Sequence, residues 1–102
     1  MLDETMNSEQ IQDLAKAMLT LATREEALVF FEDIFTIKEL QAVAQRLAVA
    51  RLLKQKVTYQ DIADQTGAST ATISRVNRSL TYGAGGYQMV LAKMDKASAQ
   101  EE

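Results

Sequence analysis

The segment that most constrains the fold is VTYQDIADQTGASTATISRVNRSL, residues 57–80. It predicts two short helices joined by a tight turn. Thr58 and Ser69 are candidate N-caps, because their hydroxyls can accept hydrogen bonds from the first free N–H groups of a helix. Asp61 stands three residues after Thr58, in the position that a capping box fills with an acid. Gly67 stands where the chain must turn sharply, since glycine tolerates a positive φ.

The residues on both sides of this glycine have the spacing of two helices that cross. Ile62, Ala63 and Thr66 come before it, and Ile73 and Val76 come after it. Ala63 is small at the position where the two helices would approach most closely. The pattern predicts a helix-turn-helix, a motif whose second helix enters the major groove of DNA.

The surface that the second helix would offer to solvent suits double-stranded DNA. It carries short hydroxyl and methyl groups and two arginines, and it carries no acid. Such groups can approach base edges and hold phosphates; an ordinary helical hairpin with a polar outer face is the alternative. The predicted DNA-binding residues are Ser69, Thr70, Ala71 and Ser74 at base edges, and Thr72, Arg75 and Arg78 at phosphates or, for the arginines, guanine.

The charge of the chain is distributed unevenly, although its net charge is only −3. Residues 1–35 hold two basic and eight acidic residues, a net charge of −6. Residues 36–80 hold seven basic and three acidic residues, a net charge of +4. Positive charge therefore collects around the predicted helix-turn-helix, and an acidic half beside a basic half would weaken non-specific DNA binding.

Composition predicts one all-α domain over residues 1–102. The chain has no proline and few aromatic residues, and helix-forming residues dominate. It has no histidine and no cysteine, so the common metal-binding sets and His-based nucleophiles are excluded. The segment GAGG lacks the lysine and the preceding strand of a phosphate-binding loop. We therefore expect no enzyme, no metal and no cofactor.

No apolar run is long enough to span a bilayer, and the N-terminus lacks a secretion signal. These features predict a cytoplasmic protein without a membrane partner.

Residues 1–35 predict a dimerisation element. After a frayed segment 1–7, a helix is expected to begin near Asn7 or Ser8 and to end near Leu21 or Ala22. Thr23 would open a second helix, with Glu26 completing a capping box. This second helix is apolar around much of its circumference, and such helices are normally buried. Packing on the chain's own later helices is the alternative to dimerisation. The apolar residues are Leu28, Val29, Phe30, Phe31, Ile34 and Phe35.

A third helix is expected over residues 36–56, opened by Thr36 with Glu39 as its capping-box partner. Arg46 and Arg51 lie outside its apolar stripe. The predicted buried stripe comprises Leu40, Val43, Ala44, Leu47, Ala50 and Leu53.

Residues 81–97 are expected to contain a glycine break and a C-terminal helix. The segment TYGAGGY interrupts the chain at residues 81–87. The last helix would run from Tyr87 to about Ala97, with Met89, Val90 and Met94 facing inward. Residues 98–102 are predicted to form a disordered tail.

The run from Phe35 through Leu80, FTIKELQAVAQRLAVARLL leading into a helix-turn-helix that ends TATISRVNRSL, resembles the Trp repressor superfamily. The segment TGASTATISRVNRSLTYGAGGYQMV is most similar to its YerC/YecD branch. The resemblance covers about residues 28–91. It implies an all-α fold of about six helices and an intertwined homodimer, whose two reading helices address successive major-groove faces about 34 Å apart.

The resemblance also implies a possible effector pocket. In Trp repressor, tryptophan lies between two arginines, and Arg46 and Arg75 match these positions. Thr36 and Ser79 match two hydroxyl residues of the same pocket. The tryptophan-binding repressors have a glycine where this chain has Val76. A β-branched side chain there would fill the space of the indole, so we do not expect tryptophan to be the co-repressor.

The sequence therefore predicts a homodimeric transcriptional regulator that binds specific DNA sites. Repression is favoured over activation, because a small dimer can act simply by occupying an operator. The alternative is a helical interaction module that keeps the fold without reading DNA.

Overall fold

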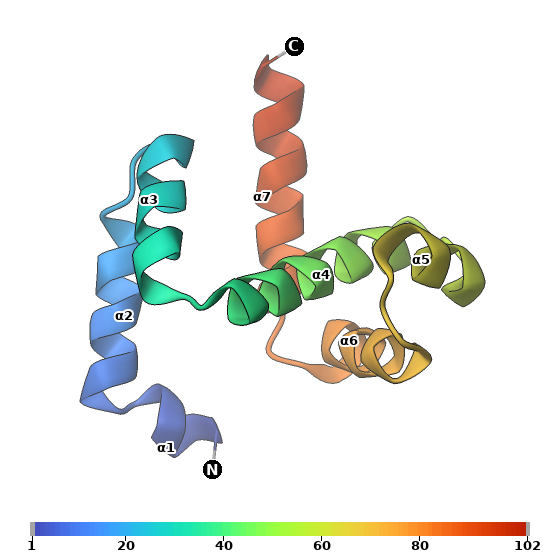
Figure 1. Cartoon of the computed structure of the whole chain (residues 1–102), viewed down its shortest axis with the longest axis horizontal. Coiled ribbons are helices and arrows are strands. Elements are labelled where there is room, and N and C mark those ends of the chain that lie inside the picture. The colour runs from blue at the N-terminus through green and yellow to red at the C-terminus, as the bar shows by residue number, and fades with distance from the viewer. Residues whose placement is uncertain (1, 102) are drawn as a thin grey trace. The chain divides into compact units, whose positions relative to one another are not determined.

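The computed structural model describes residues 2–101, and these form helices joined by short connections, with no strand (Figure 1). The all-α prediction is confirmed. The described chain divides into two compact units, one up to Leu40 and one from Gln41 onward. The organisation of residues 1–102 as one domain stays a prediction. The seven helices are α1 (Leu2–Met6), α2 (Glu9–Leu19), α3 (Arg24–Ile34), α4 (Ile37–Lys54), α5 (Tyr59–Thr66), α6 (Thr70–Tyr82) and α7 (Gly86–Glu101).

The helix α1 forms where the sequence predicted a frayed segment. The Gln12 side chain donates a 2.6 Å hydrogen bond to the Met6 carbonyl, and the Ser8 N–H donates one of 3.1 Å to the Thr5 carbonyl. These bonds satisfy carbonyl groups that a free helix end would leave to water. One helix is thereby added to the expected six.

The caps of α2 and α3 follow the sequence. Ser8 accepts from the Ile11 N–H, and Thr23 accepts from the Glu26 N–H. The Glu26 carboxylate accepts from the Ala22 N–H rather than from Thr23, so the box closes one residue earlier. The helix α2 ends at Leu19, before the predicted end, because the Thr20 hydroxyl and N–H both turn back to the Ala17 carbonyl.

The N-terminal unit buries little of its apolar surface. Neither α2 nor α3 contains a buried residue. Phe31 and Phe35 stack edge to face, with ring centroids 5.7 Å apart, and both rings are only half-buried. The large apolar side chains that remain exposed in this unit are Met6, Leu14, Met18, Leu19, Leu28, Val29, Ile34 and Ile37.

The start of α4 is a complete capping box. The Thr36 N–H donates to the Glu39 carboxylate at 2.9 Å, and the Glu39 N–H donates to the Thr36 hydroxyl at 3.1 Å. Hydrogen bonding with Thr36 lowers the pKa of Glu39 below its ordinary value. The hydrogen bond with the Thr36 backbone has the larger effect, and the one with its side chain has the smaller effect.

The end of α4 is a tight reversal at Lys56. The Val57 N–H reaches the Leu52 carbonyl at 3.1 Å, and the Lys56 N–H reaches the Leu53 carbonyl at 3.0 Å. This pairing is that of a Schellman motif, which needs a left-handed residue. Lys56 supplies it with φ = 66°.

The core of the second unit lies between α4, the helix-turn-helix and the start of α7. The burial of Ile62, Ile73 and Val76 confirms the predicted contact between crossed helices. The predicted stripe of α4 is only partly right, because Val43 and Ala44 are exposed and Val49 is fully buried instead. The buried core consists of Val49, Ala50, Ile62, Ala68, Ile73, Val76 and Leu91.

The turn of the helix-turn-helix is built as the sequence predicts. Thr58 caps α5 and Ser69 caps α6 through their hydroxyls. Gly67 is left-handed, with φ = 75° and ψ = 5°, and its N–H donates to the Ala63 carbonyl at 2.8 Å. The Thr66 hydroxyl also belongs to the turn, because it donates to the Ile62 carbonyl and accepts from the Ala68 N–H.

The prediction for the inward face of the last helix is wrong. Met89 is 53% exposed, and Val90 and Met94 are also exposed, whereas Leu91 is 1% exposed. Tyr87 packs against the same core as Leu91. These two residues are four apart, so they share a helix face, and that face meets α6.

The prediction of a disordered tail is also corrected. The helix α7 continues through residues 98–101, where no glycine or proline interrupts it, and Glu102 lies outside the described residues. None of the described helices is both long and apolar enough to cross a membrane.

Candidate nucleic-acid interface

The outer face of α6 bears a shallow hollow of about 590 Å³. Four of the predicted DNA-binding residues line it: Ala71, Ser74, Arg75 and Arg78. The other lining residues are Tyr59, Asn77, Thr81 and Tyr82, which the sequence analysis missed. Thr81 and Tyr82 stand three and four residues after Arg78, so helical periodicity could have identified them. Tyr59 comes from α5, and no local pattern predicts its position.

The remaining predicted DNA-binding residues lie outside this hollow. Ser69 and Thr70 are exposed at the N-terminal end of α6. The Ser69 hydroxyl accepts from the Thr72 N–H and donates to the Thr72 hydroxyl, both at 3.1 Å. Ser69 is therefore first a helix cap, and the proton of the Thr72 hydroxyl remains available to another acceptor.

The electrostatics of the hollow favour an anion. Its lining contains Arg75 and Arg78 and no acidic residue. Neither arginine forms an ion pair or a hydrogen bond within the described part of the chain. Their positive charges are therefore not neutralised by the protein itself and stay free to meet phosphates.

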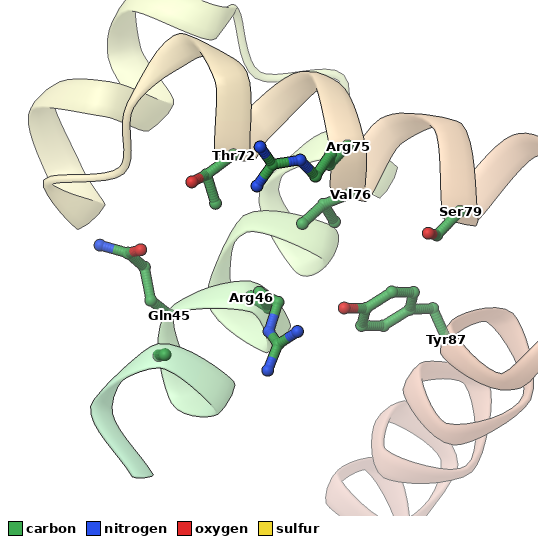
Figure 2. Close-up of a pocket in the computed structure, with 8 residues that line it drawn as sticks. Gln45, Arg46, Thr72, Arg75, Val76, Ser79 and Tyr87 are labelled. Atoms are coloured by element: carbon green, nitrogen blue, oxygen red, sulfur yellow. The ribbon is translucent and has the colours of Figure 1, made fainter. Parts of the chain in front are cut away.

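A second cavity of about 380 Å³ lies between α4, α6 and α7 (Figure 2), and Arg75 lines both this cavity and the outer hollow. It brings together Arg46, Arg75 and Ser79, three of the four residues of the predicted effector pocket. Thr36 is not among its lining residues; its hydroxyl caps the start of α4. The complete lining consists of Ala42, Gln45, Arg46, Thr72, Arg75, Val76, Ser79 and Tyr87.

Two residues that the sequence analysis missed shape this inner cavity. The Gln45 side chain donates a 3.2 Å hydrogen bond to the Thr66 carbonyl, which ties α4 to the end of α5. The ring of Tyr87 extends from α7 between α4 and α6, with its hydroxyl toward Arg46 (Figure 2). Buried Val76 forms part of the wall, and the cavity persists beside it.

Comparison with known proteins agrees with this architecture. Residues 9–95 match the family model described as Trp repressor protein. Over 97 residues, the chain is 42% identical to YerC of Bacillus subtilis, an uncharacterized protein, and the match covers 95% of this chain and 93% of YerC.

Two crystal structures are similar over almost the whole chain. A TrpR-like protein from Eubacterium eligens has a TM-score of 0.86 at 47% identity, covering 90% of this chain and 95% of the other. A proposed Trp repressor from Staphylococcus aureus has a TM-score of 0.87 at 46% identity, covering 93% of this chain and 95% of the other. The resemblance noted in the sequence is confirmed: the chain belongs to the Trp repressor family.

Proposed function

We propose that the protein is a transcriptional regulator that binds operator DNA as a homodimer and represses by occupying its site. The observation that carries this proposal is the outer face of α6. It exposes short hydroxyl and methyl side chains beside Arg75 and Arg78, whose charges no acid of the hollow neutralises. Small groups allow close approach to base edges, and guanidinium groups bind phosphates or guanine.

The cap of α6 supports the same role. The backbone before the recognition helix is fixed by Gly67, by the Thr66 hydroxyl and by Ser69. A side chain can discriminate between bases only if its helix is held in one orientation. The paired hydrogen bonds of this turn provide that rigidity before any DNA is bound.

Homodimerisation is supported by the N-terminal unit. The helices α2 and α3 have no buried residue, yet both carry large apolar side chains. A second copy covering this surface would remove it from water, which is favourable. Sedimentation equilibrium tests this, and a well-folded monomer at micromolar concentration would defeat it.

In vitro selection of duplexes from a random library tests the function directly. The regulator should enrich a palindromic site, because a twofold dimer presents two equivalent recognition helices. Failure to enrich any site, together with flow-through on a DNA column at low salt, would favour a helical protein-interaction module instead.

The variant Arg78→Ala then tests the role of the outer hollow. Each Arg78 that neutralises one phosphate should contribute about 0.9 to the magnitude of the slope of log affinity against log salt concentration. A dimer has two copies of Arg78, so the variant should reduce the magnitude of this slope by about 1.8. Arg51→Ala is a matched control, because the Arg51 guanidinium lies against the Met94 sulfur, 3.5 Å away on α7. An unchanged slope for Arg78→Ala would remove that residue from the phosphate contacts.

A further inference from the structure

Two tyrosines of the outer hollow have hydroxyls that the described part of the chain does not use. Tyr82, the last residue of α6, is 84% exposed, and Tyr59, the first residue of α5, is 38% exposed. Neither hydroxyl has a hydrogen-bond partner among the described residues. A tyrosine stabilises a protein mainly by burying its ring and pairing its hydroxyl, and Tyr82 does neither.

Both tyrosines share the hollow with the two arginines. The lining joins residues of α5 and α6 into one continuous surface that contains no carboxylate. A phenolic O–H is a neutral hydrogen-bond donor, and a guanidinium is a charged one. Together these donors suit an anion with several oxygens, which in duplex DNA is the phosphate group.

The helix α6 is long enough for its two ends to reach different parts of the DNA, the bases at one end and the phosphate backbone at the other. From Ala71 to Tyr82 the helix axis extends about 16 Å, at about 1.5 Å per residue. The major groove is only about 12 Å wide. When the N-terminal residues of a recognition helix reach base edges, as this motif requires, Thr81 and Tyr82 lie beyond the base edges, at the level of the phosphates.

We propose that Tyr59 and Tyr82 donate hydrogen bonds from their hydroxyls to phosphates of the DNA backbone and thereby position α6 in the groove. The proposal rests on the DNA-binding function proposed above. It assigns the two tyrosines to affinity and register rather than to base recognition. The two tyrosines and Arg78 should also differ in their effect on the salt dependence of binding. A neutral donor binds a phosphate without displacing counterions, whereas a charged guanidinium displaces them.

The test uses the full chain with Tyr59→Phe, Tyr82→Phe and the double variant. Each keeps the ring and removes only the hydroxyl, so the fold is retained and circular dichroism checks it. Ser98→Ala is the control, because it removes an exposed hydroxyl outside the lining of the hollow. Affinity is measured at several salt concentrations for the selected duplex and for a scrambled one.

Each phenylalanine variant should bind both duplexes at least about tenfold more weakly, the loss expected for a hydrogen bond to a charged group. The salt slope should equal that of the wild type. An equal affinity of wild type and both variants would overturn the proposal, and so would a loss confined to the selected duplex. If the wild type binds neither duplex, the DNA-binding function itself fails, which is a distinguishable result.

Discussion

Two of the three positive-φ residues described in the second unit, Lys56 before α5 and Gly67 after it, allow a paired test of the turns that flank this helix, with opposite expected signs. Gly67 has φ = 75°, and Lys56 has φ = 66°. Left-handed backbone costs an L-residue about 1–2 kcal/mol. Replacing glycine by alanine also stabilises the folded state by about 0.4–1 kcal/mol, because it reduces the conformational entropy of the unfolded chain. Gly67→Ala should therefore destabilise the protein by about 1 kcal/mol, the difference between these two effects.

Sterics add nothing to this value. A Cβ built on Gly67 has no heavy atom within 4 Å, so the whole effect arises from backbone strain. Gly67→Asn should be milder, because asparagine tolerates the left-handed region. Lys56→Gly should have the opposite sign and stabilise the protein by about 1 kcal/mol.

Urea unfolding followed by circular dichroism measures these differences, and an effect of 1 kcal/mol corresponds to a change in Tm of about 4–8 °C. Gly86→Ala is the control, because Gly86 is helical, its φ is not positive and its Cβ would meet open space. This substitution should stabilise slightly. If Gly67→Ala were as stable as the wild type, or if Lys56→Gly were destabilising, the left-handed geometry would not control the turn.

Two further predictions concern Glu39 and the inner cavity. The hydrogen bonds with Thr36 lower the pKa of Glu39 in the folded protein. At a pH above the ordinary pKa of glutamate, the charged carboxylate therefore stabilises the folded state. This stabilisation is lost as the pH falls through the lowered pKa. The stability advantage of the wild type over Glu39→Gln should accordingly shrink on acidification, as pH-dependent urea unfolding and an NMR titration of the carboxyl carbon would show. Tryptophan should leave DNA affinity unchanged, since Val76 occupies the cavity wall; a tryptophan-dependent gain in a binding titration would show that the cavity accepts an indole.

The helix-turn-helix could be predicted in detail because its signals are local. Thr58 and Ser69 act on N–H groups three residues away, and Gly67 acts on its own φ. Each cause and its effect lie within a few residues. Local hydrogen bonding and backbone preference therefore suffice to place this motif.

The packing of the last helix could not be predicted in the same way. This helix carries apolar side chains on several faces, so periodicity alone does not select the buried one. Met89 and Val90 satisfy a helical pattern as well as Leu91 does. The choice depends on which face meets α6, and only the folded second unit determines that.

The inner cavity is the clearest case of a non-local site. Its walls come from three helices, and Gln45 and Tyr87 are far apart in the chain. Arg46 and Arg75 were assigned to an effector pocket only because they match positions in a known family. Neither hydrophobic periodicity nor charge could have brought Tyr87 next to them.

The apolar surface of the N-terminal unit links the stability of the protein to its assembly. Leu28 is 57% exposed, Val29 is 64% exposed and Ile37 is 76% exposed. Fully burying a side chain of this kind contributes about 1.5–3 kcal/mol, so these three positions alone leave several kcal/mol of stabilisation unused in the single chain. A domain is normally stable by only about 5–15 kcal/mol, so a contribution of this size is a large fraction of total stability. In the proposed dimer, the second copy supplies that contribution, so that formation of the N-terminal unit and pairing of two recognition helices become one event.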